Sequence, residues 1–220
     1  MKRKYLAMLF FLLPLSIFCQ FSIDYYDAFK MATLNLSGLG LTEIPTVSCY
    51  FDGVVDINFS GNKFISIPDD IKNLGKTVFS VNMSNNKITE LGDGIFELTN
   101  VDNLDFQINE ITKISKNIGN LTNLKMLFLN TNKLTDIPKE ISGCITLKGL
   151  FLSNNQLKTL PLELSKCRGL ESLDLSGNQL TEIPIVITFL TNLRTLDLTR
   201  NLLTPAQKEA GKRLFPFAKF

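Results

Sequence analysis

Four aspartates are the side chains whose type and spacing come nearest to a catalytic arrangement: Asp56, Asp105, Asp174 and Asp197. Paired carboxylates perform acid–base chemistry when their surroundings separate their pKa values. Asp174 and Asp197 stand at equivalent places in successive stretches of alternating apolar and polar residues, which puts both on the solvated face of neighbouring strands. Nothing there is expected to exclude water from one carboxylate and not the other. The spacing therefore favours no catalytic pair, and we expect no enzyme activity.

Histidine is absent from all 220 residues. Its absence excludes a Ser-His-Asp triad, a Cys-His dyad and a histidine-ligated zinc. No segment has the dense oxygen ligands of a calcium-binding loop. We expect no catalytic residue, no metal, no cofactor and no small-molecule substrate.

The charge balance is nearly neutral. Of 23 basic residues, three (Lys2, Arg3 and Lys4) precede a removable apolar run, so 20 basic residues face 21 acidic ones and the net charge is −1. This balance argues against a general nucleic-acid binder.

A repeat of 23 residues runs through most of the chain. The segments LKMLFLNTNKLTDIPKEISGCIT, LKGLFLSNNQLKTLPLELSKCRG and LESLDLSGNQLTEIPIVITFLTN follow one another. An asparagine marks each unit, with one spacing of 24 residues and five of 23: Asn62, Asn86, Asn109, Asn132, Asn155, Asn178 and Asn201. A first unit has Leu39 at this place, so eight units occupy residues 34–203.

Each unit predicts a strand, a tight turn and a helical return. Leu127-Phe128-Leu129 shows the alternation of a strand with one buried face. The marker asparagine follows the strand, where its amide is expected to satisfy backbone groups of the turn. Ile137, Ile141 and Cys144 have the spacing of a helical or 3-10 turn. The predicted fold is an α/β solenoid.

The pattern L-x-x-L-x-L-x-x-N-x-L-T-x-I-P-x-x-I-x-x-L resembles the leucine-rich repeat family in its 23-residue Leu/Ile-Pro form, over roughly four-fifths of the chain. The chain is similar to small secreted bacterial members. The resemblance implies a horseshoe with a parallel concave sheet and short helical or 3-10 convex turns, and a role in binding a protein, such as a host or cell-surface protein. Gly92 and Ser115 replace the proline in two units and are expected to loosen those turns.

The first nineteen residues have the order of a secretory signal. A basic start precedes the apolar run Tyr5 to Phe18, which is too short to span a bilayer comfortably. We expect cleavage between Cys19 and Gln20 and a secreted chain. Two alternatives are a lipidated Cys19, which would make a lipid-anchored structural or adhesive surface protein, and an uncleaved anchor.

Caps are expected at both ends of the solenoid. Residues 20–33 include Ser22 to Ala32, which could form a short amphipathic helix. Residues 204–220 begin with Thr204, Pro205 and Gln207, the residue types of a helix N-terminus. This helix should run to about Phe215, and Phe217 and Phe220 could close the last unit as a strand.

Cys49, Cys144 and Cys167 remain after residue 19, an odd number without a C-x-x-C pair. Cys144 and Cys167 share a register with Leu121 and Leu190, so they should stack in the core. Neighbouring strands are close enough for a disulfide. We nevertheless expect free thiols that pack as small apolar side chains.

The candidate binding face comes from the residue between the two apolar strand residues, which points to the concave side. In order these residues are Asn35, Asn58, Asn82, Asp105, Phe128, Phe151, Asp174 and Asp197. Phe128 and Phe151 stand out, and Met126 and Ile108 extend them. With Asp105, Asp174 and Asp197 alongside, they predict a surface for a protein that presents basic residues around an apolar group. The alternative is a cross-strand pair that only stabilises the sheet.

A second apolar group is predicted on the convex side. Ile185, Val186 and Phe189 occupy registers that hold Lys139, Glu140 and Gly143 in an earlier unit. They could support weak self-association, or the C-terminal cap could cover them.

Overall fold

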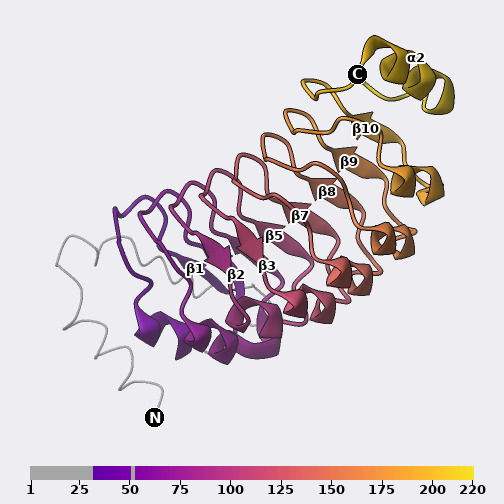
Figure 1. Cartoon of the computed structure of the whole chain (residues 1–220). Coiled ribbons are helices and arrows are strands. Elements are labelled where there is room, and N and C mark those ends of the chain that lie inside the picture. The colour runs from indigo at the N-terminus through magenta and orange to yellow at the C-terminus, as the bar shows by residue number, and fades with distance from the viewer. Residues whose placement is uncertain (1–31, 51–52) are drawn as a thin grey trace.

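The structure, a computed structural model, describes residues 32–50 and 53–220. The predicted signal segment, Cys19 and nearly all of the expected N-terminal cap lie outside the described residues. The described chain forms a curved solenoid whose eight principal strands lie side by side, with the C-terminal helix α2 (Pro205–Leu214) at one end (Figure 1).

One parallel sheet of eight strands follows the repeat, one strand a unit, and confirms the predicted solenoid. Its strands in order are β1 (Ala32–Asn35), β2 (Val54–Asn58), β3 (Ser80–Asn82), β5 (Asn103–Asp105), β7 (Met126–Phe128), β8 (Gly149–Phe151), β9 (Ser172–Asp174) and β10 (Thr195–Asp197). Each strand pairs with the equivalent residues of the next, as Leu127 does with Leu150. A fixed repeat length therefore becomes a fixed register.

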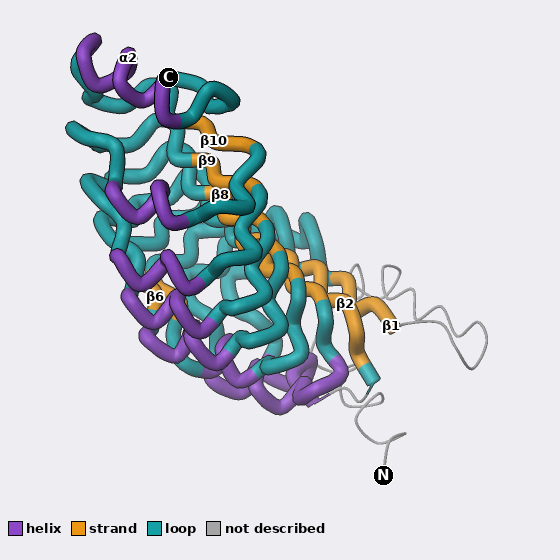
Figure 2. Tube along the Cα trace, turned by 90° about the vertical axis from the view of Figure 1, so that its right-hand side faces the viewer, coloured by secondary structure: helices purple, strands orange, loops and turns teal. Residues whose placement is uncertain are grey.

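Short 3-10 helices form the opposite, convex side, as Figure 2 shows. They are η2 (Thr46–Tyr50), η3 (Asp69–Thr77), η4 (Gly94–Glu97), η5 (Lys116–Asn120), η6 (Lys139–Gly143), η7 (Leu162–Lys166) and η8 (Ile185–Phe189). A proline comes directly before η3, η6, η7 and η8, where its fixed φ suits the start of a helical turn. Among the helices of the described chain, none has the length and apolar character needed to span a bilayer.

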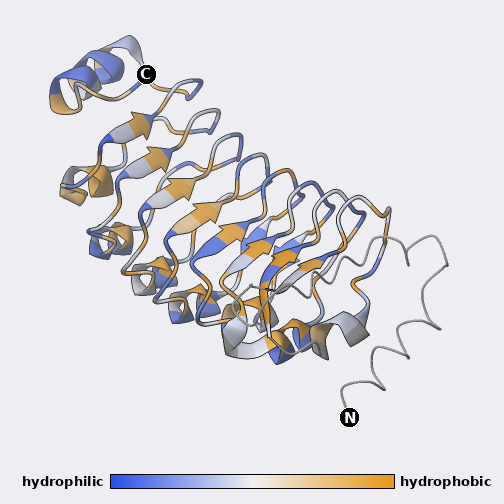
Figure 3. Ribbon diagram, turned by 180° about the vertical axis from the view of Figure 1, so that it is seen from behind, coloured by the Kyte–Doolittle hydropathy of each residue, from blue (hydrophilic) through white to orange (hydrophobic). Residues whose placement is uncertain are grey.

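The core lies between the sheet and the 3-10 helices. Apolar residues recur in every strand (Figure 3), and the middle apolar residue is buried in all eight units: Leu34, Ile57, Val81, Leu104, Leu127, Leu150, Leu173 and Leu196. A single unit is too thin to bury these side chains, so each unit depends on its neighbours for stability.

The marker asparagines lie under the turn that follows each strand. Asn155 donates from Nδ2 to the carbonyl oxygens of Leu129 (2.9 Å) and Leu152 (3.0 Å), and its Oδ1 accepts from the N–H of Leu134 (3.0 Å). The same bonds join Asn86, Asn109, Asn132, Asn178 and Asn201 to their own and preceding units. In the first unit, where Leu39 replaces the marker, Asn62 Oδ1 accepts from the N–H groups of Leu39 and Leu41.

A second, two-stranded sheet forms in the units that lack proline. Its strands β4 (Glu90–Leu91) and β6 (Lys113–Ile114) are parallel. The N–H of Ser115 donates to the carbonyl oxygen of Leu91 at 2.9 Å, a bond that proline would remove. The expectation that Ser115 loosens its turn was wrong, because its free N–H adds a bond between units. The expectation for Gly92 stays a prediction.

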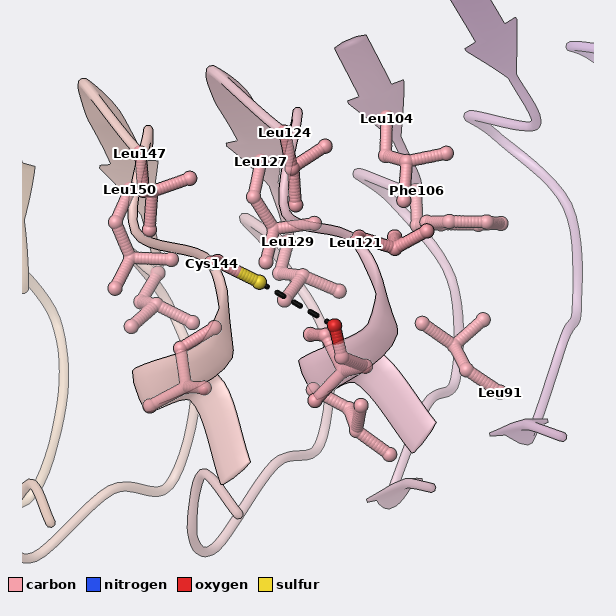
Figure 4. Packing of buried hydrophobic residues seen from close by; sticks show 14 of the residues in the cluster. Leu91, Leu104, Phe106, Leu121, Leu124, Leu127, Leu129, Cys144, Leu147 and Leu150 are labelled. Atoms are coloured by element: carbon pink, nitrogen blue, oxygen red, sulfur yellow. Dashed lines mark hydrogen bonds between the residues drawn. The ribbon is translucent and has the colours of Figure 1, made fainter. Parts of the chain in front are cut away.

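Cys49, Cys144 and Cys167 are free thiols buried in the core. Cys144 Sγ donates to the carbonyl oxygen of Ile118 and Cys167 Sγ to that of Ile141, each at 3.3 Å. Figure 4 shows the Cys144 sulfur pointing to that oxygen among leucine side chains. Burial raises the pKa of Cys144 to about 12 and that of Cys167 to about 11, so neither thiol is activated.

The C-terminal residues close the last unit. Helix α2 (Pro205–Leu214) begins with a capping box, in which Thr204 Oγ1 accepts from the N–H of Gln207 at 3.3 Å. Beyond it, Lys219 pairs with β10: its N–H donates to Leu196 at 2.9 Å and its carbonyl oxygen accepts from Leu198 at 2.8 Å. Gly211 of α2 has no Cβ, which leaves room for the ring of Phe220.

Candidate protein-binding surface on the concave face

Phe128 and Phe151 form a stacked pair in the middle of the concave face. Their Cα atoms are partners in the pairing of β7 with β8, their ring centroids are 4.7 Å apart, and the ring planes differ by 5°. Both side chains remain partly exposed. The pair thus has the stacking of a cross-strand contact, and it also keeps apolar surface toward solvent.

Met126 completes the aromatic cluster, here defined as Met126, Phe128 and Phe151, and Gly149 lies beneath it. A Cβ on Gly149 would lie 2.7 Å from Met126 Cε and 2.8 Å from Phe151 Cε2. The missing side chain of Gly149 is therefore what lets Met126 and Phe151 close over β8. Sequence reasoning missed Gly149, although its place on the sheet, where other units have a side chain, was a usable signal.

Six of the eight residues that point to the concave side between the apolar strand residues are polar, and each caps the turn that follows its strand. Asp174 Oδ1 accepts from the N–H (2.9 Å) and the hydroxyl (2.8 Å) of Ser176, two residues later. Equivalent bonds to the residue two positions on are made by Asn35, Asn58, Asn82, Asp105 and Asp197. Such side-chain caps stabilise the turn after a strand.

Phenylalanine cannot make this cap, so two adjacent units give it up. Asn130 compensates for one of them: its Oδ1 accepts from the N–H and the hydroxyl of Ser153 in the next unit, both at 3.1 Å. Phe128 and Phe151 thus lack the turn cap that the equivalent residue makes in the other six units.

Ile108 is an exposed apolar residue in the unit before the one that carries Phe128. It lies in the turn after β5, its φ is 56°, and its side chain is 50% exposed. A β-branched residue is strained in this left-handed region. Equivalent positions hold glycine or asparagine in five units (Gly38, Gly61, Asn85, Asn154 and Gly177) and Thr131 and Arg200 in the other two, so Ile108 is the one apolar residue at this position among the eight units. The N–H of Ile108 donates to the carbonyl oxygen of Asn130 at 2.9 Å, so this exposed side chain stands at the edge of the unit that carries Phe128.

The three carboxylates beside the aromatic cluster differ in how many of their oxygen atoms already have a partner. Both oxygens of Asp105 accept hydrogen bonds from Gln107 at 3.0 Å, and burial raises the pKa of Asp105 against the opposing effect of those bonds. Asp197 Oδ2 lies 4.0 Å from Lys219 Nζ. Asp174 Oδ2 has no hydrogen-bond or charge partner in the described part of the chain. The carboxylates thus serve as turn caps, and Asp174 has the freest oxygen.

Asn103 supplies a polar atom that sequence reasoning did not single out. It pairs with Met126 across β5 and β7, and its buried Oδ1 has no hydrogen-bond partner among the described residues. No sequence signal marks this atom, since its burial depends on how neighbouring side chains pack.

Of the three apolar residues predicted to be exposed on the convex side, only two are exposed. Ile185 and Phe189 are 62% and 55% exposed, and α2 does not cover them, but Val186 is only 1% exposed. Val186 occupies the register of Glu140 and Glu163, which are half-buried, and a short apolar side chain there sinks fully into the core. The inclusion of Val186 in a self-association surface was wrong.

Comparison with known proteins agrees with this geometry. Residues 145–185 and 169–208 match the family described as leucine rich repeats in two copies. A leucine-rich repeat protein of Leptospira interrogans is 30% identical, with a TM-score of 0.67 over 86% of this chain and 54% of that one. This chain is a leucine-rich repeat protein. Proteins of this fold are usually non-catalytic scaffolds, and the repeat domain is typically a protein–protein interaction module.

Two further structures show how widely this leucine-rich repeat fold is shared. The Arabidopsis receptor kinase HAESA, solved with a peptide hormone and a co-receptor, is 26% identical with a TM-score of 0.70, over 84% of this chain and 33% of that one. An internalin of Listeria monocytogenes, at 21% identity and a TM-score of 0.66 over 86% of this chain and 59% of that one, shares the fold alone. This chain thus spans about half the length of the Leptospira protein and a third of the receptor. No curated protein matches the sequence.

Proposed function

We propose that this chain is an exported, non-enzymatic interaction module that binds a protein ligand on its concave face. The aromatic cluster is the centre of the surface, with Ile108 at its edge and Asp105, Asp174 and Asp197 beside it. One observation carries the proposal: a solvent-facing aromatic pair stands where all six other units keep a turn cap.

Stability alone gives no reason for the pair. A lost cap costs about 1 kcal/mol; two are given up, and Asn130 replaces one of them. A stacked aromatic pair returns about 0.5–1.5 kcal/mol, so the exchange is roughly even in stability. Covering these rings with a partner would add about 25 cal/mol for each Å² of apolar surface removed from water. Aromatic residues at the centre of a polar surface are typical of the few side chains that dominate protein binding.

Similar proteins support this class of function. HAESA was solved with a peptide hormone, and Toll of Drosophila, 26% identical with a TM-score of 0.68 over 74% of this chain and 24% of that one, was solved in complex with Spätzle. A binding role also agrees with a chain that lacks histidine and uses its concave carboxylates as caps. We place the ligand outside the cell, as a host or cell-surface protein, on the strength of the signal-like first nineteen residues.

The test compares the chain with a Phe128→Asn/Phe151→Asn variant. Asparagine restores the residue found at Asn35, Asn58 and Asn82, so the variant should keep its fold and melt in denaturant at least as late as the parent. Both chains are immobilised and exposed to serum and extracellular-matrix proteins, and retained proteins are identified by mass spectrometry. A ligand bound only by the parent supports the proposal. Equal retention by the folded variant moves the binding surface elsewhere.

A further inference from the structure

We propose that the part of the concave face between Phe151 and Asp174 receives an arginine side chain of the protein ligand. This inference rests on the proposed function and specifies the chemistry of the partner: an arginine next to an apolar side chain. Three features carry it, namely the open end of the aromatic stack, the free oxygen of Asp174, and the absence of basic residues at the concave positions of the eight strands.

The aromatic stack ends at Phe151. The two rings are parallel and separated by about the distance between neighbouring strands, so their faces point along the solenoid axis. One face of Phe151 is covered by Phe128. The other faces β9, where the residues on the concave side are Ser172 and Asp174, both small and partly exposed. A planar group from a ligand can therefore form the next layer of the stack.

Asp174 places a negative charge at that layer. Its Oδ1 is occupied by Ser176, and its Oδ2 has no partner among the described residues. Asp174 pairs with Phe151 across β8 and β9, so a cation stacked on the ring lies within reach of the carboxylate. Asp105, on the far side of Phe128, is less suited because Gln107 occupies both of its oxygens.

The eight-stranded sheet carries no basic residue at its concave positions, while four aspartates stand there: Asp56, Asp105, Asp174 and Asp197. The basic residues nearest to the strands face acidic ones. The hydrogen bond from Lys148 lowers the pKa of Glu171, and Arg194, just before β10, lowers it further. Lys219 Nζ lies 4.0 Å from Asp197 Oδ2. Lysines also occur just before β7 and β8. Lys125 Nζ lies 3.1 Å from Asp102 Oδ2, and Lys148 Nζ lies 2.7 Å from Glu171 Oε1. Among the described residues, no basic side chain forms an ion pair with Asp174, so its carboxylate can accept a cation of a ligand.

Arginine suits this place better than lysine. The guanidinium group is planar, stacks on an aromatic face and donates hydrogen bonds in its own plane, so one group can contact Phe151 and Asp174 together. A lysine ammonium is compact and more strongly hydrated, and it gives up more water for the same contact.

The experiment uses N-acetyl-arginine amide as the probe and N-acetyl-citrulline amide, which has the same shape without the charge, as its control. Backbone amide shifts of the protein are followed by NMR during titration. We expect saturable changes centred on Phe151 and residues 172–176 with arginine, weaker ones with the lysine analogue, and none with citrulline. Asp174→Asn should weaken the arginine affinity about fivefold.

Asp174→Asn is a matched variant because asparagine caps the turn in three other units, so its fold should be unchanged. Asp105→Asn serves as the control and should bind the probe like the parent. Equal binding of citrulline, equal binding by Asp174→Asn, or shift changes centred elsewhere would each overturn the arginine inference.

Failure of this inference is distinguishable from failure of the proposed function. If the probe does not depend on Asp174 but Phe128→Asn/Phe151→Asn still loses the protein ligand, only the arginine assignment is wrong. If that double variant keeps the ligand, the proposed surface is wrong, and binding of the arginine probe near Asp174 would then have no part in ligand recognition.

Discussion

At the scale of single residues, the repeat provides its own controls, because every position of one unit has equivalents in the others. Ile108 illustrates this. Its backbone has the same left-handed φ as Asn85 and Asn154, yet it carries a β-branched side chain that disfavours that conformation. Thr131, also β-branched, has nearly the same φ at the equivalent position, so what distinguishes Ile108 is its exposed apolar side chain, which agrees with the proposed ligand contact.

Ile108→Asn should raise the free energy of unfolding by about 1 kcal/mol, because asparagine tolerates a positive φ. The same change should weaken ligand binding. Denaturant melts and binding assays on one preparation measure both effects, and Asn85→Ile, at the equivalent place in another unit, should lower stability without affecting the ligand. A loss of stability in Ile108→Asn would show that the side chain is a structural requirement.

The buried thiols make stability depend on alkaline pH. Burial raises the pKa of Cys49 from 9.0 to about 11, that of Cys144 to about 12 and that of Cys167 to about 11. Above pH 9 the unfolded chain therefore releases thiol protons that the folded chain retains, so the unfolding free energy falls as pH rises. Because lysine and tyrosine titrate in the same range, the slope between pH 8.5 and 10.5 (roughly the span set by these pKa values) should be compared with that of a variant carrying alanine at all three positions. The variant should lose less stability, and identical slopes would contradict the prediction.

At the scale of elements, the two-stranded sheet of β4 and β6 shows how one residue type decides pairing. Ser115 has φ −61° and ψ 147°, which proline could adopt, so a proline there would remove the bond to Leu91 without straining the backbone. Ser115 also accepts from the N–H of Asn117 and donates from its hydroxyl to Asp93.

Ser115→Pro should therefore lower the free energy of unfolding by about 2 kcal/mol, and Ser115→Ala by about 1 kcal/mol, since alanine loses only the hydroxyl bonds. The difference between the two denaturant midpoints reports the backbone bond between units. Equal midpoints would mean that β4 and β6 contribute nothing through this N–H.

Hydrophobic periodicity indicates which side chains point inward. It therefore predicted the strands, the 3-10 turns, the core residues and the register between units. Periodicity does not indicate which polar atoms form hydrogen bonds within the turns or between units. The cap made by Asp174 to Ser176, the bond from Ser115 to Leu91 and the role of Gly149 therefore appeared only in the structure. Val186 was misplaced for a related reason: the pattern treats its register as exposed, while the depth of that register depends on side-chain length.

At the scale of the whole molecule, the proposed function depends on where the chain is delivered. A concave face that binds a host or cell-surface protein is useful only outside the cell, and the feature that predicts export is the apolar run from Tyr5 to Phe18 behind three basic residues. Mass spectrometry of the extracellular protein should find Gln20 as the mature N-terminus. A lipidated Cys19 would indicate the lipid-anchored adhesive protein, and membrane fractionation with and without globomycin separates it from the secreted form. The two forms present the same concave face, but a lipidated chain would bind its ligand only at the cell surface. An intact Met1 in the extracellular fraction would contradict both forms and remove the reason for placing the ligand outside the cell.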